Sequence, residues 1–134
     1  MQIDISNLIK AHETLKTAYD FLKNNQNSQI QSMLEDSCAK RFEYTLETAR
    51  KLIKKILKKN YAKDEIELTV NNTFRFAQGY NFISNWTNWR NYWEKRNNTA
   101  HEYNLEKSRE VIVLIPDFLK DTQELINNLK AFLC

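Results

Sequence analysis

The segment at residues 93–103, WEKRNNTAHEY, combines residue types that could act on a phosphodiester. His101 is one of two histidines in the chain, and a histidine can accept and return a proton near neutral pH. Arg96 carries a permanent, forked cation that suits phosphate oxygens and the charge of a phosphoryl transition state. A base and a phosphate clamp can cleave RNA by attack of the ribose 2′-hydroxyl, which DNA lacks. The same residues would also suit the solvent-facing polar end of a helix.

Helical geometry places a condition on this chemistry. On an unbroken helix His101 lies roughly 140° around from Arg96, whereas Tyr103 returns to within about 20° of it. Residues 99–102 could form a capping box that restarts a helix, or Asn104 could cap the next helix and leave the motif at the end of the preceding one. We favour Asn104, because a break at 99 leaves little room before the next helix. A second copy of the motif, supplied by a dimer partner, would then complete the site.

Cations concentrate in the segment from residue 50 to 63, although the net charge of the chain is only +3. This basic ridge predicts either a solvated helix face or a surface that attracts phosphates. On the second reading we expect RNA to contact Arg50, Lys51, Lys54, Lys55 and Lys58. We expect no metal and no cofactor, because Glu94 and Glu102, on either side of the motif, lack companions at ligand spacing.

The elements that position these residues are predicted to be helices. The chain has one glycine and one proline in 134 residues, too few for sheets with tight turns, and no segment alternates with a period of two. Apolar residues recur instead at steps of three and four. They predict a first helix through residues 8–22, a second over 29–60, a third from near Asp64 to Gly79, a fourth from about Ser84 into the motif, and a fifth after Asn104. We therefore predict an all-α, up-and-down bundle of four to five helices forming a single domain over 1–134.

Several side chains on these stripes have a specific expectation. His12 and Cys38 are predicted to be core or boundary residues, and Pro116 to kink the fifth helix or lie near its start. The predicted stripes of the second, third and fifth helices include Met33, Ile66 and Phe132, respectively.

Aromatic residues crowd the fourth helix and the segment before it. Their density fits either core packing or a helix that also meets another chain, and the second reading predicts a homodimer. The residues concerned are Tyr80, Trp86, Trp89, Tyr92 and Trp93. No apolar run approaches a membrane span and the first residues do not form a signal peptide, so we expect a cytoplasmic protein without membrane association.

Two segments resemble a known superfamily. Arg96, Asn97 and His101 match the signature of the HEPN superfamily (higher eukaryotes and prokaryotes nucleotide-binding domains), and Tyr103 matches the longer Arg-x4-His-x-Tyr form of the HepT-type toxins. The segment KRFEYTLETARKLIKKIL, residues 40–57, is similar to a helix of the nucleotidyltransferase substrate-binding branch. The resemblance covers nearly the whole chain, although that branch usually has a tryptophan at the position of residue 50.

The resemblance implies more than the spacing does. It implies an all-α HEPN domain that dimerises across the motif and is paired with a minimal nucleotidyltransferase antitoxin. In the toxin branch the helical protein is a metal-independent ribonuclease that the partner silences by attaching AMP. If the matching motif residues have the same roles here as in the toxin branch, Arg96 and His101 would be catalytic, Asn97 would support them, and Tyr103 would receive the AMP. The alternative is a non-catalytic, nucleotide-binding subunit of a two-component nucleotidyltransferase, and a helical scaffold without a site is a third reading.

Overall fold

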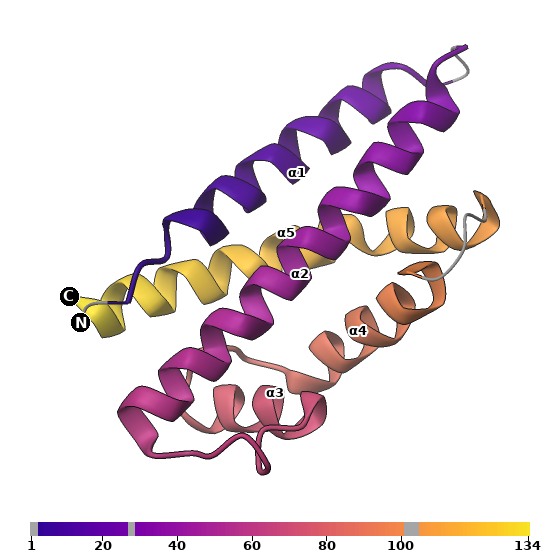
Figure 1. Ribbon diagram of the computed structural model, residues 1–134. Coiled ribbons are helices and arrows are strands. Elements are labelled where there is room, and N and C mark those ends of the chain that lie inside the picture. Colours follow the sequence, from indigo (N-terminus) through magenta and orange to yellow (C-terminus); the bar gives the residue numbers. More distant parts are fainter. Residues whose placement is uncertain (1–2, 27–28, 101–104) are drawn as a thin grey trace.

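Five α-helices account for most of the chain in this computed structural model, which describes residues 3–26, 29–100 and 105–134 (Figure 1). The helices are α1 (Ser6–Asn24), α2 (Gln31–Tyr61), α3 (Val70–Gly79), α4 (Trp86–Ala100) and α5 (Leu105–Leu133). The described ranges contain no strand. The predicted all-α bundle is therefore confirmed.

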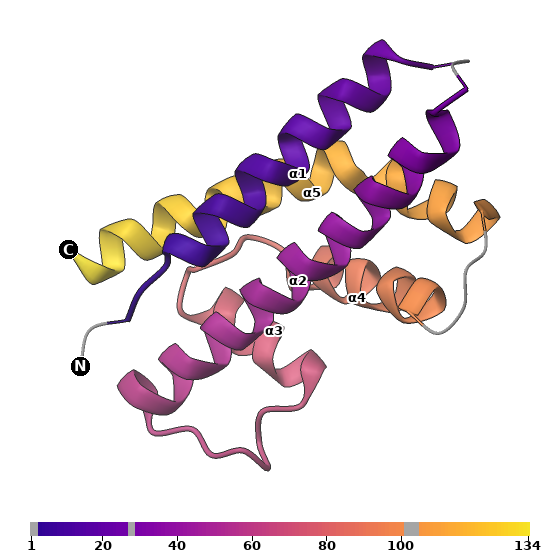
Figure 2. The ribbon, with the colours of Figure 1, turned by 45° about the horizontal axis from the view of Figure 1, so that its top comes forward.

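The long helix α2 is the centre of the arrangement. It packs against α1, α3, α4 and α5, and Figures 1 and 2 both show α1 running antiparallel beside its N-terminal half. Helix α5 crosses behind α1 and α2, α4 runs back along the first half of α5, and α3 lies below the C-terminal half of α2. The N-terminal segment and the end of α5 lie together, where Ile3 and Leu133 line one shallow hollow. The described part of the motif, residues 93–100, forms the last turns of α4 and is thus held by the contacts of α4 with α2 and α5.

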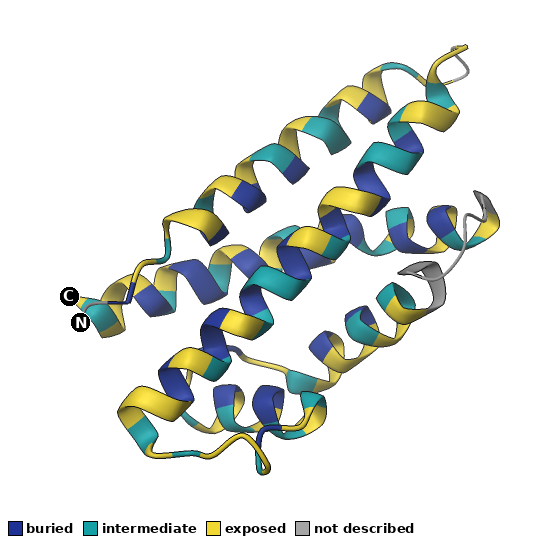
Figure 3. Cartoon of the chain, viewed as in Figure 1, coloured by how far each residue is buried: buried dark blue, intermediate teal, exposed yellow. Residues whose placement is uncertain are grey.

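An aromatic cluster forms the centre of the core. The Phe42 ring lies 4.7 Å from that of Phe118, and Trp89 lies 5.7 Å from both Phe74 and Phe118. Tyr92 completes the cluster, with its ring 5.1 Å from Phe118. Figure 3 shows the buried positions recurring on the inward faces of the helices. Burying each such side chain stabilises the fold by roughly 1.5–3 kcal/mol relative to leaving it in water, so this cluster fixes α4 against α2 and α5.

The start of the third helix is corrected by the structure. Asp64 and Glu67 do exchange capping hydrogen bonds, with Asp64 Oδ1 accepting from the Glu67 amide at 2.9 Å and Glu67 Oε1 accepting from the Asp64 amide at 3.0 Å. These bonds close only a turn, and α3 begins at Val70, where Thr69 Oγ1 accepts from the amide of residue 72 at 3.2 Å. The predicted core residue Ile66 lies on this turn and is 90% exposed. A capping box closes one turn, and here the chain does not continue it as a helix.

Other expectations about single residues are mostly confirmed. His12 is buried, with Nε2 3.1 Å from the carbonyl oxygen of Leu119, and Cys38 is fully buried. Pro116 lies inside α5 rather than near its start, on the solvent-facing side of the helix. Two predicted core residues are wrong: Met33 is 69% exposed and Phe132 is 37% exposed. Each lies near an end of its helix, where Phe132 packs on one side only, against the rings of Phe82 and Tyr61 at 5.0 and 6.2 Å.

Candidate functional site

One carboxylate joins two arginines at the contact between α2 and α4. Glu47 Oε1 lies 2.8 Å from Arg50 Nη2, one turn further along α2. The other oxygen, Oε2, lies 3.4 Å from Arg96 Nη2 on α4. The three side chains are only 17–27% exposed, so these charges interact in a partly desolvated site. We call this set, together with Trp93, the Glu47–Arg96 cluster.

The indole of Trp93 organises the two guanidinium groups. The guanidinium carbon of Arg50 lies 5.0 Å from the centre of the ring, and that of Arg96 lies 4.8 Å from it. Both distances fall within the range of a cation–π interaction, which is strongest on tryptophan. The ring also reduces the freedom of two long side chains. The cluster therefore holds two forked cations within reach of one small anion.

The motif residues are only partly within the described ranges. Asn97 is exposed, and its Oδ1 accepts a hydrogen bond from Arg96 Nη1 at 3.3 Å. His101 and Tyr103 lie outside the described residues, as does the predicted cap Asn104. Helix α4 ends at 100 and α5 begins at 105, so the described part of the motif forms the end of α4.

The motif pattern did not identify Glu47. Its spacing from Arg50 is that of an ordinary ion pair within one helix, and its contact with Arg96 joins positions 49 residues apart. The only available signal was its place in the segment 40–57 that carries the family resemblance. The structure adds this residue to the predicted site.

The basic ridge is partly neutralised from within the molecule. Arg50, Lys51, Lys54, Lys55 and Lys58 line one shallow hollow of about 300 Å³ on α2. Lys54 Nζ lies 2.6 Å from a carboxylate oxygen of the turn before α3, on residue 65, and Lys58 pairs with the same carboxylate. Hydrogen bonds from these two lysines lower the pKa of that carboxyl group to about 2. The ridge is therefore both a cationic surface and the anchor of this turn.

The aromatic crowding on α4 belongs largely to the core. Trp89 and Tyr92 are buried, and the Tyr92 hydroxyl donates to Asp121 Oδ2 at 2.5 Å. Burial, with this bond to Asp121, raises the pKa of Tyr92 far above its usual range, and burial also raises the pKa of the Asp121 carboxyl. Tyr80, Trp86 and Trp93 are only partly buried, so the expectation of a homodimer rests on these three residues.

The chemistry of the cluster is that of anion binding. Two guanidinium groups on one carboxylate are the arrangement that would equally hold a phosphate, since both anions offer oxygens to a fork of N–H donors. Within the described ranges no three His, Cys, Asp or Glu side chains gather to hold a metal ion, and no helix has the length and apolar character needed to cross a bilayer.

Comparisons with known proteins identify the family of this chain and agree with its all-α fold. The sequence model of the family described as "nucleotidyltransferase substrate binding protein like" matches residues 3–131. The chain therefore belongs to this family.

Solved structures similar to this chain include proteins of Haemophilus influenzae and Thermus thermophilus. One is HI0074 of Haemophilus influenzae, whose structure is described as revealing the fold of a substrate binding domain of a nucleotidyltransferase. It is 25% identical to this chain, the TM-score is 0.82, and the match covers 95% of this chain and 99% of HI0074. The other is a protein of Thermus thermophilus, with 19% identity, a TM-score of 0.65, and coverage of 86% and 98%, which supports the fold alone. Among curated proteins, none matches the chain.

Proposed function

We propose that this protein is the helical, substrate-binding subunit of a two-component nucleotidyltransferase. The family match over residues 3–131 carries the proposal, and the similarity to HI0074 over nearly the whole chain supports it. The chain supplies the bundle and a cationic site, and the partner supplies the nucleotidyl-transfer chemistry. Intact Arg96 and its neighbour Asn97 mark the end of α4 as the ligand-facing region.

The Glu47–Arg96 cluster is the proposed phosphate contact. Arg50 and Arg96 already converge on one carboxylate at 2.8 and 3.4 Å, so a phosphate entering the cluster would meet two preoriented forks. Preorientation lowers the entropic cost of binding, because Trp93 already restricts both side chains. Glu47 would then compete with the ligand, which makes binding dependent on a strong anion.

The test is assembly and transfer with a minimal nucleotidyltransferase, to be sought among the genes beside this one. Co-expression should give a stable complex, and Arg96→Ala should lower transfer by tenfold or more while the complex still forms. Arg90→Ala is the matched control, because Arg90 is an exposed arginine of the same helix that pairs with Glu94 at 3.8 Å, outside the cluster. Failure of the two proteins to associate under any condition would contradict the proposed function.

A metal-independent ribonuclease toxin is the second candidate. It is favoured by the position of Arg96 near the end of α4, where Arg96 and Arg50 converge on Glu47, and by its place five residues before His101 in the sequence. In this reading His101 is the base, Arg96 the clamp and Asn97 a support. Cleavage should persist in EDTA and leave 2′,3′-cyclic or 3′ phosphates, and His101→Ala should reduce it by roughly a hundredfold or more. Intact RNA after incubation with the unmodified protein would reject this candidate.

The ribonuclease candidate also predicts that attached AMP silences the protein and that the protein forms a homodimer. Incubation with the partner nucleotidyltransferase and ATP should add the mass of AMP to the tryptic peptide that contains Tyr103. Addition only at other residues would contradict the role that the resemblance gives to Tyr103. A homodimer through the α4 region should appear in sedimentation at micromolar concentration, and Trp93→Glu should weaken it. A monomer for the unsubstituted chain would remove the composite site.

The basic ridge provides an independent test of RNA contact. Replacing Lys51 and Lys55 by glutamate should weaken RNA binding and flatten its salt dependence, because each lost phosphate contact removes released counterions. These two lysines are preferable to Lys54 and Lys58, whose pairing with residue 65 also holds the turn before α3. Lys51 Nζ lies 3.9 Å from Glu47 Oε1, so Lys55→Glu alone is the variant that leaves the Glu47–Arg96 cluster intact. An unchanged salt slope would identify the ridge as a solvated face.

A further inference from the structure

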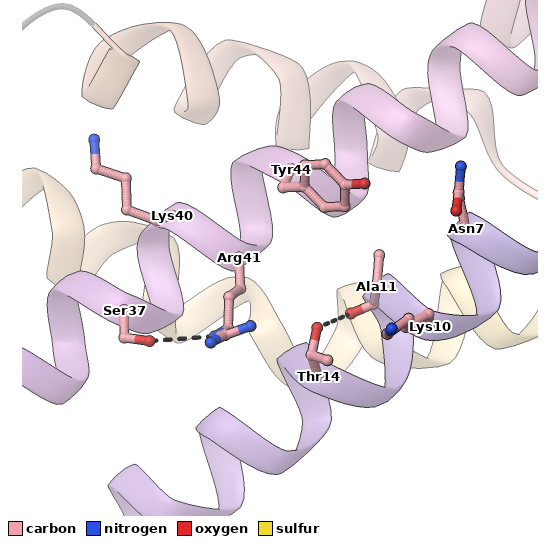
Figure 4. A pocket seen from close by; sticks show the side chains of 8 residues that line it. All are labelled: Asn7, Lys10, Ala11, Thr14, Ser37, Lys40, Arg41 and Tyr44. Carbon is pink, nitrogen blue, oxygen red and sulfur yellow. Dashed lines mark hydrogen bonds between the residues drawn. The ribbon is translucent and has the colours of Figure 1, made fainter.

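A groove between α1 and α2 lies apart from the Glu47–Arg96 cluster. It has a volume of about 520 Å³, within the range of small-molecule sites, and Figure 4 shows the side chains that line it. Ala11, which is almost fully buried, forms part of its floor, and its short side chain leaves the space open. On α2, Arg41 is six residues from Glu47 and so points about 120° away from it around the helix. Helix α1 packs on α2 and α5, whereas the cluster faces α4.

The charge of this groove is uncompensated by its own lining. Lys10, Lys40 and Arg41 line it, and none of the described residues that line it is acidic. Arg41 is held by Ser37, whose Oγ accepts from Arg41 Nε at 3.3 Å, and Figure 4 shows the guanidinium reaching from α2 toward α1 while Lys40 stands at the rim. The basic ridge differs, because two of its lysines share a carboxylate. An anion is therefore the ligand that this groove would attract most strongly.

An exposed aromatic ring stands beside these cations. Tyr44 lies one turn after Arg41 on α2 and is 59% exposed, which is high for so large an apolar surface. An adjoining hollow of about 440 Å³ shares Thr14, Ser37 and Arg41 with the groove and adds Phe21, which is 54% exposed, together with the acidic Glu13. Exposed rings beside an arginine are the elements with which proteins hold a base by stacking and its phosphate by charge.

We propose that the α1/α2 groove binds a nucleoside phosphate, with the base stacked on Tyr44 and the phosphate held by Arg41 and Lys10. This inference goes beyond the proposed function, because it assigns a second anion site that lies apart from the Glu47–Arg96 cluster. The ligand is either a free nucleotide or one unit of a single strand, and Phe21 would take a further base in the second case.

The experiment is isothermal titration of the full chain with AMP, with ATP and with a single-stranded RNA of about six nucleotides. The unsubstituted protein should bind at least one of these probes. Tyr44→Ala should weaken binding roughly five- to 150-fold, the range expected for loss of one stacked base, and Tyr44→Phe should retain most of the affinity. Arg41→Ala should weaken binding tenfold or more. Lys120→Ala, an exposed lysine on α5 outside the groove, should have no effect, and circular dichroism should show every variant folded.

The outcomes separate this inference from the proposed function. Tight binding of AMP or ATP identifies a free nucleotide, and binding of RNA alone identifies a strand. Absence of binding for all probes at millimolar concentration would overturn the inference. Unchanged affinity in both Tyr44→Ala and Arg41→Ala would also overturn the inference. This includes the result that Arg96→Ala abolishes binding while these two variants bind normally. Assembly with the nucleotidyltransferase tests the proposed function independently, because it requires no nucleotide in this groove.

Discussion

Replacing Glu47 by glutamine should destabilise the fold by an amount that the cluster geometry sets. The substitution preserves the shape of the side chain but removes the charge shared by Arg50 and Arg96, which lie at 2.8 and 3.4 Å. Exposed ion pairs contribute about 0.2–1 kcal/mol, whereas breaking a buried pair costs about 3–5 kcal/mol. The side chains here are 17–27% exposed, so an intermediate loss of about 2 kcal/mol in the free energy of unfolding is expected.

Urea denaturation followed by far-ultraviolet circular dichroism measures this loss. A double-mutant cycle with Arg96→Gln isolates the α2–α4 pair, for which a coupling energy of about 1 kcal/mol is expected. Glu94→Gln is the matched control, because the side chain of Glu94 is 65% exposed and lies 3.8 Å from Arg90. This substitution should lower the free energy of unfolding by less than about 0.5 kcal/mol. The reasoning is refuted if Glu47→Gln costs no more than the control, or if the cycle shows no coupling.

The same variant tests the role of the cluster in binding. If Glu47 occupies the place of a phosphate, its neutralisation should strengthen the binding of inorganic phosphate several-fold while it weakens the fold. A variant that loses both stability and phosphate binding would instead show that the carboxylate positions the two arginines and does not compete with the ligand.

Three further predictions concern ionisable groups away from the cluster. Arg109→Ala should cost about 3 kcal/mol in urea denaturation, because it leaves the carboxylate of Glu35, only 5% exposed, without the guanidinium that contacts it at 2.8 Å. Above about pH 10 the unfolded chain releases a tyrosine proton that folded Tyr92 retains, because burial and its bond to Asp121 raise the pKa of Tyr92. Stability should therefore fall as the pH rises there, with a shallower slope in Tyr92→Phe. The pKa of Glu65 is lowered to about 2, so its contribution is present above the ordinary carboxyl pKa and lost as the pH falls from about 4.5 toward 2. Glu65→Gln should flatten the acid part of a pH–stability curve, and an unchanged curve would contradict the pairing.

The sequence alone was sufficient to predict the helices. Apolar residues recur at the helical period over α1, α2 and α5, and the low glycine and proline content excludes a fold with many tight turns, so both predict a bundle without knowledge of any contact. It also placed Arg96 and Asn97 at the end of α4, because the motif lies at the end of a periodic segment. These are local properties, since the face on which a residue lies depends only on its position within its own helix.

The tertiary structure decided which faces meet. Whether Met33 and Ile66 are buried depends on where neighbouring helices end, and a capping box does not reveal that its turn stops after Glu67. Likewise, the pairing of Glu47 with Arg96 requires α4 to cross α2 at one register, which is set by the packing of Trp89 and its neighbours in the core. Periodicity specifies a buried stripe, but the partner of each residue on that stripe follows from the register and crossing of helices distant in the chain, and only the folded molecule fixes these.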